Sequence, residues 1–208
     1  AHELGHAYHG TQIQDHRPLN WNYSMPVAET ASNFNELVVM NEAISKAKGQ
    51  EKIRLVESQI QDCTQIIVDI LSRYLFEDAV FHQSKERFLY ADDLAQLMLD
   101  AQKQAFGEGL DEQVLHPYMW CCKSHYYSAG RSYYNFPYAF GGLFSRGIYA
   151  RYLEEGKSFL PRYREMLKAT TVASCEDVAK IAGIDLTDVG FWRSSLQVID
   201  DNIRIFMA

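Results

Sequence analysis

The chain has 208 residues, of which 27 are acidic and 20 are basic, so it carries a formal net charge of −7. No run of basic residues could follow a phosphate backbone, which excludes nucleic acid as an expected partner. No stretch approaches the roughly twenty apolar residues of a membrane-spanning helix. Since domains average about 150 residues, the length allows one large domain, and we expect a single α-helical region over 1–208.

The first motif of the chain is His2-Glu3-Leu4-Gly5-His6. Histidines four residues apart on a helix lie one turn above each other, so the imidazoles of His2 and His6 can bind one metal ion. Glu3 would then stand beside a water molecule carried by that ion, where it could act as a general base. The pattern is typical of zinc-dependent hydrolases, but it requires a third ligand.

Glu29 is the candidate third ligand. Pro26 suits the first turn of a helix, and apolar residues follow it at roughly helical spacing, at positions 27, 34, 37, 38 and 44. We therefore expect Glu29 in the first turn of a second helix, facing the first helix across the loop 15–25. A catalytic zinc ion takes three protein ligands and keeps one position open, and His2, His6 and Glu29 provide that set. The alternative is a carboxylate stabilised by the positive end of its own helix.

Two further polar residues follow on the same predicted helix. Asn33 lies one turn after Glu29, and Glu36 lies two turns after it. Either side chain could orient a ligand histidine through a hydrogen bond. A solvated position, or one at the edge of the core, is at least as compatible with the sequence for both residues.

The rest of the chain predicts helices joined by short loops, with no alternating pattern long enough for a sheet. After the break at Gly49 we expect one long amphipathic helix over 53–75, and Asp92 and Asp93 are expected to cap a helix that ends near Gly107. Further helices are expected over 143–153, from the capping pair Ser174 and Asp177 to Gly183, and over 191–206. The predicted fold class is all-α.

The cysteines give no sign of a metal site or of a disulfide framework. Cys63, Cys121, Cys122 and Cys175 lack paired metal spacing and are too few to hold a chain of this size together. We expect reduced thiols. The adjacent Cys121 and Cys122 could attract a metal ion or an oxidant, which is the less favoured alternative.

Between Leu115 and Gly142 the sequence becomes dense in tyrosine and phenylalanine. Ordinary aromatic packing would account for most of these side chains. A concave aromatic surface with hydroxyl donors would equally suit a bound peptide. Gly130, beside Ser128 and Ala129, indicates a flexible loop that could close over a peptide or could simply connect two elements.

Several segments resemble the oligoendopeptidase F family, within the wider thimet oligopeptidase and neurolysin group of zinc peptidases. They are residues 2–9 (His-Glu-Leu-Gly-His-Ala-Tyr-His), 28–32 (Ala-Glu-Thr-Ala-Ser) with Glu36, 125–127 (His-Tyr-Tyr), 133–141 (Tyr-Tyr-Asn-Phe-Pro-Tyr-Ala-Phe-Gly) and 183–186 (Gly-Ile-Asp-Leu). The resemblance therefore extends over nearly the whole chain.

The resemblance implies an all-α, cytoplasmic zinc metalloendopeptidase, with one zinc ion per chain, that cleaves oligopeptides inside a deep channel of which this helical unit forms one wall. The family's zinc ligands fall on His2, His6 and Glu29, and its general base falls on Glu3. Its transition-state donors fall on His125, Tyr134 and Tyr138. A further family tyrosine falls near Gly141, where this chain has none.

The position of the first motif also suggests a longer protein. The chain opens with Ala1, and no secretory or transit segment precedes His2, which the family places well inside a helix. We therefore expect residues 1–208 to be the C-terminal catalytic region of a longer chain. The expected partners are oligopeptide substrates and the missing N-terminal region of the same protein.

Two other classes of protein remain open from the sequence. Glu3 and His6 match half of the motif of di-iron helical bundles, which requires a second Glu-x-x-His that we do not find. A non-catalytic peptide-binding module with a structural zinc ion is the other alternative. Structural zinc sites are usually closed and rich in thiolates, which disfavours it.

Overall fold

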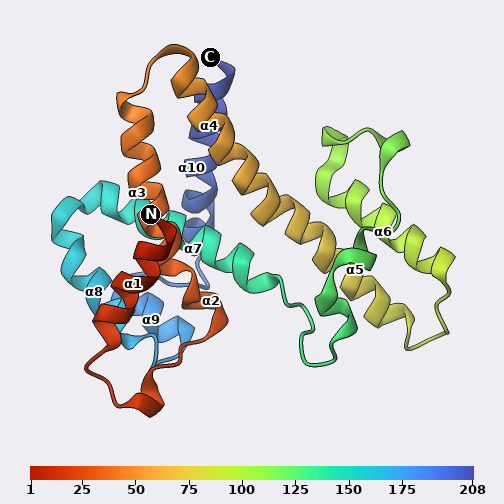
Figure 1. Cartoon of the computed structure of the whole chain (residues 1–208), viewed down its shortest axis with the longest axis horizontal. Coiled ribbons are helices and arrows are strands. Elements are labelled where there is room, and N and C mark those ends of the chain that lie inside the picture. Colours follow the sequence, from red (N-terminus) through yellow and green to blue (C-terminus); the bar gives the residue numbers. More distant parts are fainter. The chain divides into compact units, whose positions relative to one another are not determined.

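The computed structural model describes all 208 residues, and they form helices, turns and loops without a β-strand (Figure 1). The predicted all-α fold is thereby confirmed. The α-helices are α1 (His2–Ile13), α2 (Met25–Ala28), α3 (Thr30–Lys46), α4 (Gly49–Thr64), α5 (Ile70–Gln83), α6 (Ala91–Phe106), α7 (Phe136–Glu155), α8 (Leu160–Ala169), α9 (Cys175–Ile181) and α10 (Val189–Met207). None of them combines the length and the apolar character that crossing a membrane would require.

The helices are grouped into two compact units. Unit 1 contains Ala1–Gln61 and Phe140–Ala208, and unit 2 contains Asp62–Ala139. The expectation of a single α-helical catalytic region over 1–208 stays a prediction.

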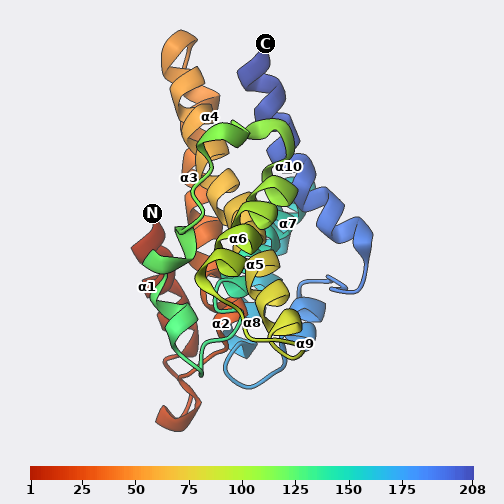
Figure 2. The same cartoon turned by 90° about the vertical axis from the view of Figure 1, so that its right-hand side faces the viewer.

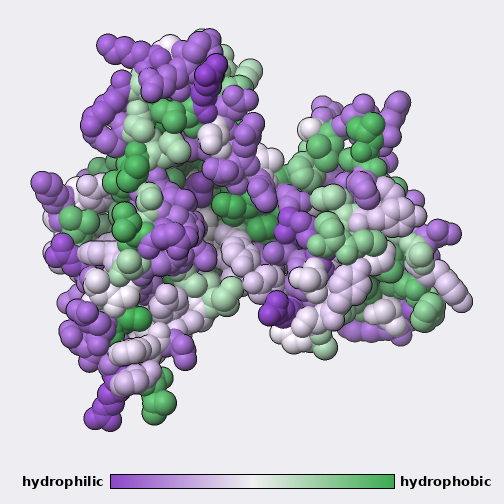
Figure 3. All heavy atoms as spheres, in the orientation of Figure 1, coloured by the Kyte–Doolittle hydropathy of each residue, from purple (hydrophilic) through white to green (hydrophobic).

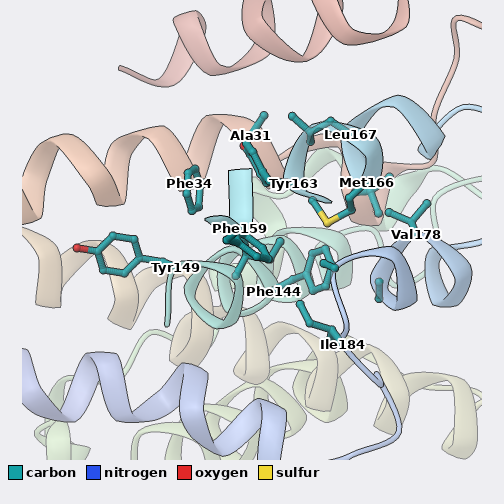
Figure 4. Close-up of a cluster of buried hydrophobic side chains, with 14 of the residues drawn as sticks. Ala31, Phe34, Phe144, Tyr149, Phe159, Tyr163, Met166, Leu167, Val178 and Ile184 are labelled. Carbon is teal, nitrogen blue, oxygen red and sulfur yellow. The ribbon is translucent and has the colours of Figure 1, made fainter. Parts of the chain in front are cut away.

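Unit 1 is built around one aromatic and aliphatic core (Figure 4). Phe34 of α3 packs against Tyr163 of α8 with ring centroids 4.6 Å apart, while Phe144 of α7 is completely buried. Burying side chains of this size stabilises a fold by about 1.5–3 kcal/mol each. The core therefore fixes α3, α7 and α8 against one another, and α1 packs onto α3 and α8.

The long helices of unit 1 are also joined by a buried polar contact. The Asn202 side chain of α10 donates a hydrogen bond of 2.7 Å to the Gln59 side chain of α4, and both residues are buried. Because an unpaired buried amide is costly, this contact fixes the register of α10 on α4.

Unit 2 has a smaller core between α5 and α6, which run side by side in Figures 1 and 2. Phe76, Met98 and Ala101 are buried there. Trp120 stacks on Phe76, and Tyr126 meets the edge of the same ring. The aromatic segment after Leu115 thus contributes to a core, as the packing interpretation predicts for most of it.

The expected long helix over 53–75 is interrupted in the structure. Residues Gln65–Asp69 form a π-helical turn between α4 and α5. Ile66, Ile67 and Val68 are consecutive β-branched residues, which have a reduced preference for the regular α-helix. The amphipathic pattern predicted that this segment is helical, but it did not predict the change from α-helical to π-helical hydrogen bonding.

The helix caps agree only in part with expectation. Ser174 caps α9 by accepting a hydrogen bond of 3.2 Å from the backbone N–H of Asp177, and Gly183 follows with a φ of +73°, as predicted. At α6 the capping residue is Tyr90, whose backbone N–H donates to the carboxylate of Asp93.

Hydrophilic side chains cover much of the face shown in Figure 3, with hydrophobic ones scattered among them. This mixture is usual for folded proteins, whose surfaces retain much apolar area. The four cysteines carry free thiols, and only Cys63 among them is buried.

Candidate metal centre

Three elements of unit 1 bring the candidate ligands together. His2 and His6 lie one turn apart on α1. Glu29 is the single residue between α2 and α3, with φ −89° and ψ 5°. It therefore precedes the second helix rather than occupying its first turn, because the chain bends at this residue between the two helices.

The three side chains converge on one point. His2 Nε2 and His6 Nε2 lie 3.2 Å apart, and Glu29 Oε2 lies 3.3 Å from the first and 3.4 Å from the second. This is the one group of at least three histidine, cysteine or acidic residues in the 208 residues that is close enough to hold a metal ion.

The triangle has the dimensions of a zinc site. Two ligand atoms of a tetrahedral ion with bonds of about 2.0–2.1 Å lie about 3.3–3.4 Å apart. The three measured separations are 3.2, 3.3 and 3.4 Å. Two nitrogens and one carboxylate oxygen are also donors that zinc accepts in catalytic sites, where the fourth position stays open. The residues present therefore fit the ion.

Two of the candidate ligands, His2 and Glu29, each contact a further polar side chain that orients them. His2 Nδ1 lies 3.3 Å from Glu36 Oε2, so a proton on Nδ1 is held there and Nε2 keeps its lone pair for a metal ion. The buried Ser32 hydroxyl donates a hydrogen bond of 2.9 Å to Glu29 Oε2. Of the two residues proposed from sequence for this role, Glu36 is in position. Asn33 lies instead beside Gly141 of α7.

Gly5, inside the histidine motif, sets the distance between α1 and α3. A Cβ atom built on Gly5 would lie 2.4 Å from Ser32 Cα and 2.5 Å from Ala31 O, which is shorter than any real contact of this kind. The backbones of the two helices can meet at this point only because residue 5 has no side chain. Sequence reasoning did not single out Gly5 or Ser32, since their importance depends on the packing of α1 on α3.

Gly141 has a similar role on the other side of Glu29. A Cβ atom there would lie 3.2 Å from Glu29 Cβ and 3.5 Å from the carbonyl oxygen of Pro26. The helix α7 therefore packs directly against the bend that carries the third ligand.

A buried histidine and a tyrosine lie next to the ligands. His9, one turn after His6, is completely buried, and its ring stacks on Tyr23 with centroids 4.3 Å apart. Burial lowers the pKa of His9 to about 4, so its ring is neutral at pH 7. Burial, and then the charge of Glu29, raise the pKa of the Tyr23 hydroxyl. No feature of the sequence distinguished these two residues from ordinary core residues.

The other proposed catalytic residues fall in two places. Glu3 is exposed on α1, one residue after His2. His125, Tyr134 and Tyr138 gather in unit 2, where the rings of His125 and Tyr134 are 5.6 Å apart and the hydroxyls of Tyr134 and Tyr138 are 3.1 Å apart. Tyr134 lies in the turn before α7, and Tyr138 lies in the first turn of that helix.

The electrostatic surroundings of His125 keep its ring neutral. The residue is buried, and burial together with the nearby charges of Arg73, Lys123 and Arg131 lowers its pKa. A neutral imidazole can donate one hydrogen bond from its ring N–H.

The fold and this site define a helical protein in which two histidines and a glutamate are close enough to hold a metal ion, and comparison with known proteins identifies its family. Residues 1–198 match the family model described as Peptidase family M3. The chain belongs to this family. The resemblance to oligoendopeptidase F, expected from the sequence, is thereby supported as well.

Known proteins of the same kind cover nearly all of the chain. It is 27% identical over 192 residues to oligopeptidase PepF of Bacillus subtilis. The aligned region covers 90% of this chain and 28% of that protein. It is 28% identical over 212 aligned positions to an oligoendopeptidase F homolog of Borreliella burgdorferi, covering 99% of this chain and 34% of that protein. The chain thus spans about a third of the length of these relatives.

A solved structure supports the fold. The crystal structure of a candidate peptidase from Chlamydophila abortus superimposes with a TM-score of 0.87 and 21% identity, over 99% of this chain and 34% of that one. At this identity the likeness concerns the arrangement of the helices.

Proposed function

We propose that the protein is a zinc metalloendopeptidase that hydrolyses peptide bonds of short oligopeptides. The observation that carries the proposal is the triangle of His2 Nε2, His6 Nε2 and Glu29 Oε2, whose sides of 3.2–3.4 Å fit one tetrahedral zinc ion. Membership of Peptidase family M3 supports the reaction class. The names of the relatives, oligopeptidase and oligoendopeptidase, support the substrate class.

His2, His6 and Glu29 would hold the ion. When bound, zinc would supply a Lewis acid and a water molecule whose pKa is lowered towards about 7. The protein's own contribution is to fix the ligands beforehand. Glu36 holds the proton of His2 on Nδ1, and Ser32 orients the Glu29 carboxylate, so neither ligand has to reorganise.

Glu3 is proposed as the general base. Its carboxylate follows His2 on α1 and is exposed to solvent, where it can take a proton from the attacking water. The resulting carboxylic acid can then give the proton to the departing amine. Because the same group accepts and returns the proton, the site needs no second acid.

His125, Tyr134 and Tyr138 are proposed to donate hydrogen bonds to the substrate carbonyl as negative charge develops on it. The support is their match to the family's donor positions and their clustering in unit 2. Because the pKa of His125 is lowered, its ring is a neutral donor, which can give one N–H hydrogen bond to the carbonyl oxygen.

The same proposal includes a further region of the protein and its location in the cell. The relatives are about three times as long as this chain, so we propose that a further region of the protein, N-terminal to these residues, completes the peptide channel. The proposed location is the cytoplasm.

The experiment combines metal analysis with the Glu3→Gln variant. The zinc-loaded protein should contain one zinc ion per chain and should cleave members of a mixed pool of short peptides. Glu3→Gln keeps the shape of the side chain but removes the proton acceptor, so activity should fall at least about a hundredfold while zinc stays bound. Glu42→Gln, which changes an exposed glutamate on α3, is the matched control and should retain both properties.

The two alternatives give different results in the same experiment. A pair of iron ions per chain would support the di-iron bundle. One zinc ion without cleavage of any peptide would support the non-catalytic binding module. Loss of zinc from Glu3→Gln would show that Glu3 is a ligand rather than a base.

A further inference from the structure

A cavity of about 450 Å³ opens beside α1 in unit 1. Its lining consists of Gly10, Ile13, Gln14, Trp21, Asn22 and Tyr23. None of these side chains is charged, and two of them are large aromatic ones. The volume falls within the range of about 300–1,000 Å³ that small-molecule sites occupy. We refer to this cavity as the Trp21 recess.

The recess continues the face of α1 that carries the metal ligands. His2, His6 and Gly10 are spaced by four residues, so they follow one another along one side of the helix. A Cβ atom on Gly10 would meet nothing within 4 Å. The space beside Gly10, four residues and about 6 Å along the helix from His6, is therefore open.

The Tyr23 wall of the recess is rigidly placed. Its ring stacks on the buried His9 at a centroid distance of 4.3 Å and an angle of 16°. His9 Nε2 lies 2.8 Å from the Thr170 hydroxyl, which follows the last residue of α8.

The Trp21 wall is anchored in the same way. The indole N–H of Trp21 donates a hydrogen bond of 2.9 Å to the carbonyl oxygen of His16. His16 Nδ1 lies 2.7 Å from the hydroxyl of Thr171. Both aromatic walls are thus tied to the end of α8, although Trp21 stays half exposed. A pocket whose walls are already ordered loses little entropy when it is filled.

We propose that the Trp21 recess receives a bulky uncharged side chain, aromatic or aliphatic, of the peptide substrate, within two residues of the bond that is cut. This inference rests on the proposed function. An extended peptide advances about 3.4 Å per residue, so a pocket one helical turn from His6 is within reach of these positions.

The lining determines which side chains fit. Aromatic and aliphatic groups would bury apolar area against Trp21, Tyr23 and Ile13. A charged side chain would lose hydration without gaining a charged partner. An alanine side chain would leave the recess mostly empty. We therefore expect selection for large apolar side chains rather than for charge.

The test uses quenched-fluorescence peptides that differ at one position, carrying Phe, Leu, Ala, Lys or Glu at each of the two residues on either side of one cleavable bond. At one of these positions the zinc-loaded protein should favour Phe or Leu over Ala by at least about tenfold in kcat/KM. Lys and Glu should be no better than Ala.

Gly10→Leu fills the recess from the α1 side and should remove this preference, while zinc titration gives an unchanged affinity. Thr11→Leu adds the same side chain at the next, exposed position of α1, outside the lining, and should retain the preference. A preference that survives Gly10→Leu, or no preference at any position, would overturn the recess alone. Cleavage of no peptide at all would overturn the proposed function together with it.

Discussion

Gly5 of α1 lies against Ser32 of α3 so closely that a Cβ atom on residue 5 would come within 2.4 Å of Ser32 Cα. Both residues are next to groups of the candidate metal centre. Gly5 lies between His2 and His6, and Ser32 donates a hydrogen bond to the Glu29 carboxylate. The distance between the two helices at this contact therefore determines whether Glu29 reaches the histidines.

Replacing Gly5 by alanine should disrupt the metal centre. The added methyl group cannot be accommodated by a flexible side chain, because the atoms it meets belong to the backbone of α3. The helices must separate, and Glu29 Oε2 moves away from the two imidazoles. We expect zinc affinity to fall at least about tenfold, as measured by competition with a chelating dye.

Gly10→Ala is the matched control for this substitution. It adds the same methyl group to the same helix at a position where nothing lies within 4 Å of the new atom. Zinc affinity should be unchanged. Equal affinities of Gly5→Ala and the parent protein would mean that the contact with α3 does not set the position of Glu29.

Glu36→Gln tests the orientation of His2. The amide can still accept a hydrogen bond from His2 Nδ1, at present 3.3 Å from Glu36 Oε2, but it lacks the negative charge that would complement a metal-bound imidazole. Removing such partners usually lowers metal affinity about 10-fold to 100-fold. We expect a loss near the lower limit by zinc titration. Glu42→Gln, on the same helix, should show none, and a similar loss in both variants would contradict the role of Glu36.

The sequence predicted which candidate metal ligands lie together, because their geometry is mostly local. A spacing of four residues on a helix places His2 and His6 together whatever the rest of the fold does. Glu29 required one further step, the expectation of a second helix nearby. Its position between α2 and α3 was not predicted, because the helical spacing of the apolar residues runs through residue 29 without marking a break there.

The residues that sequence reasoning missed act through tertiary contacts. Gly5 and Ser32 matter because α1 rests on α3, and Tyr23 matters because it stacks on His9. The two residues of each contact are far apart in the sequence, and no sequence motif links them. The π-helical turn over Gln65–Asp69 was missed for a different reason, since an amphipathic repeat continues through it with little change.

His9 predicts a loss of stability in acid. Burial lowers its pKa from 6.5 to about 4, so the unfolded chain binds a proton between these values that the folded protein does not. The stabilisation is complete above about pH 6.5 and is lost as the pH falls towards 4. From this group alone, the free energy of unfolding should be about 2 kcal/mol lower at pH 5 than at pH 7.

Urea unfolding at both pH values, with a chelator present to keep the histidine ligands free of metal, measures this difference. His9→Gln should remove most of it, whereas His82→Gln, at an exposed position, should retain it. The same pH dependence in His9→Gln and in the parent protein would assign the effect to other groups.

Tyr138→Phe tests the donor role in the proposed mechanism. The substitution removes one hydroxyl and very little volume, so a donor that acts on the developing oxyanion should lose kcat with KM nearly unchanged. We expect kcat to fall on the order of a hundredfold in a peptide hydrolysis assay. Tyr127→Phe removes an exposed hydroxyl of the same unit, which contacts the carbonyl oxygen of Cys121, and should leave kcat unaltered. If Tyr138→Phe also keeps its kcat, Tyr134, whose hydroxyl lies 3.1 Å from that of Tyr138, becomes the residue to replace next.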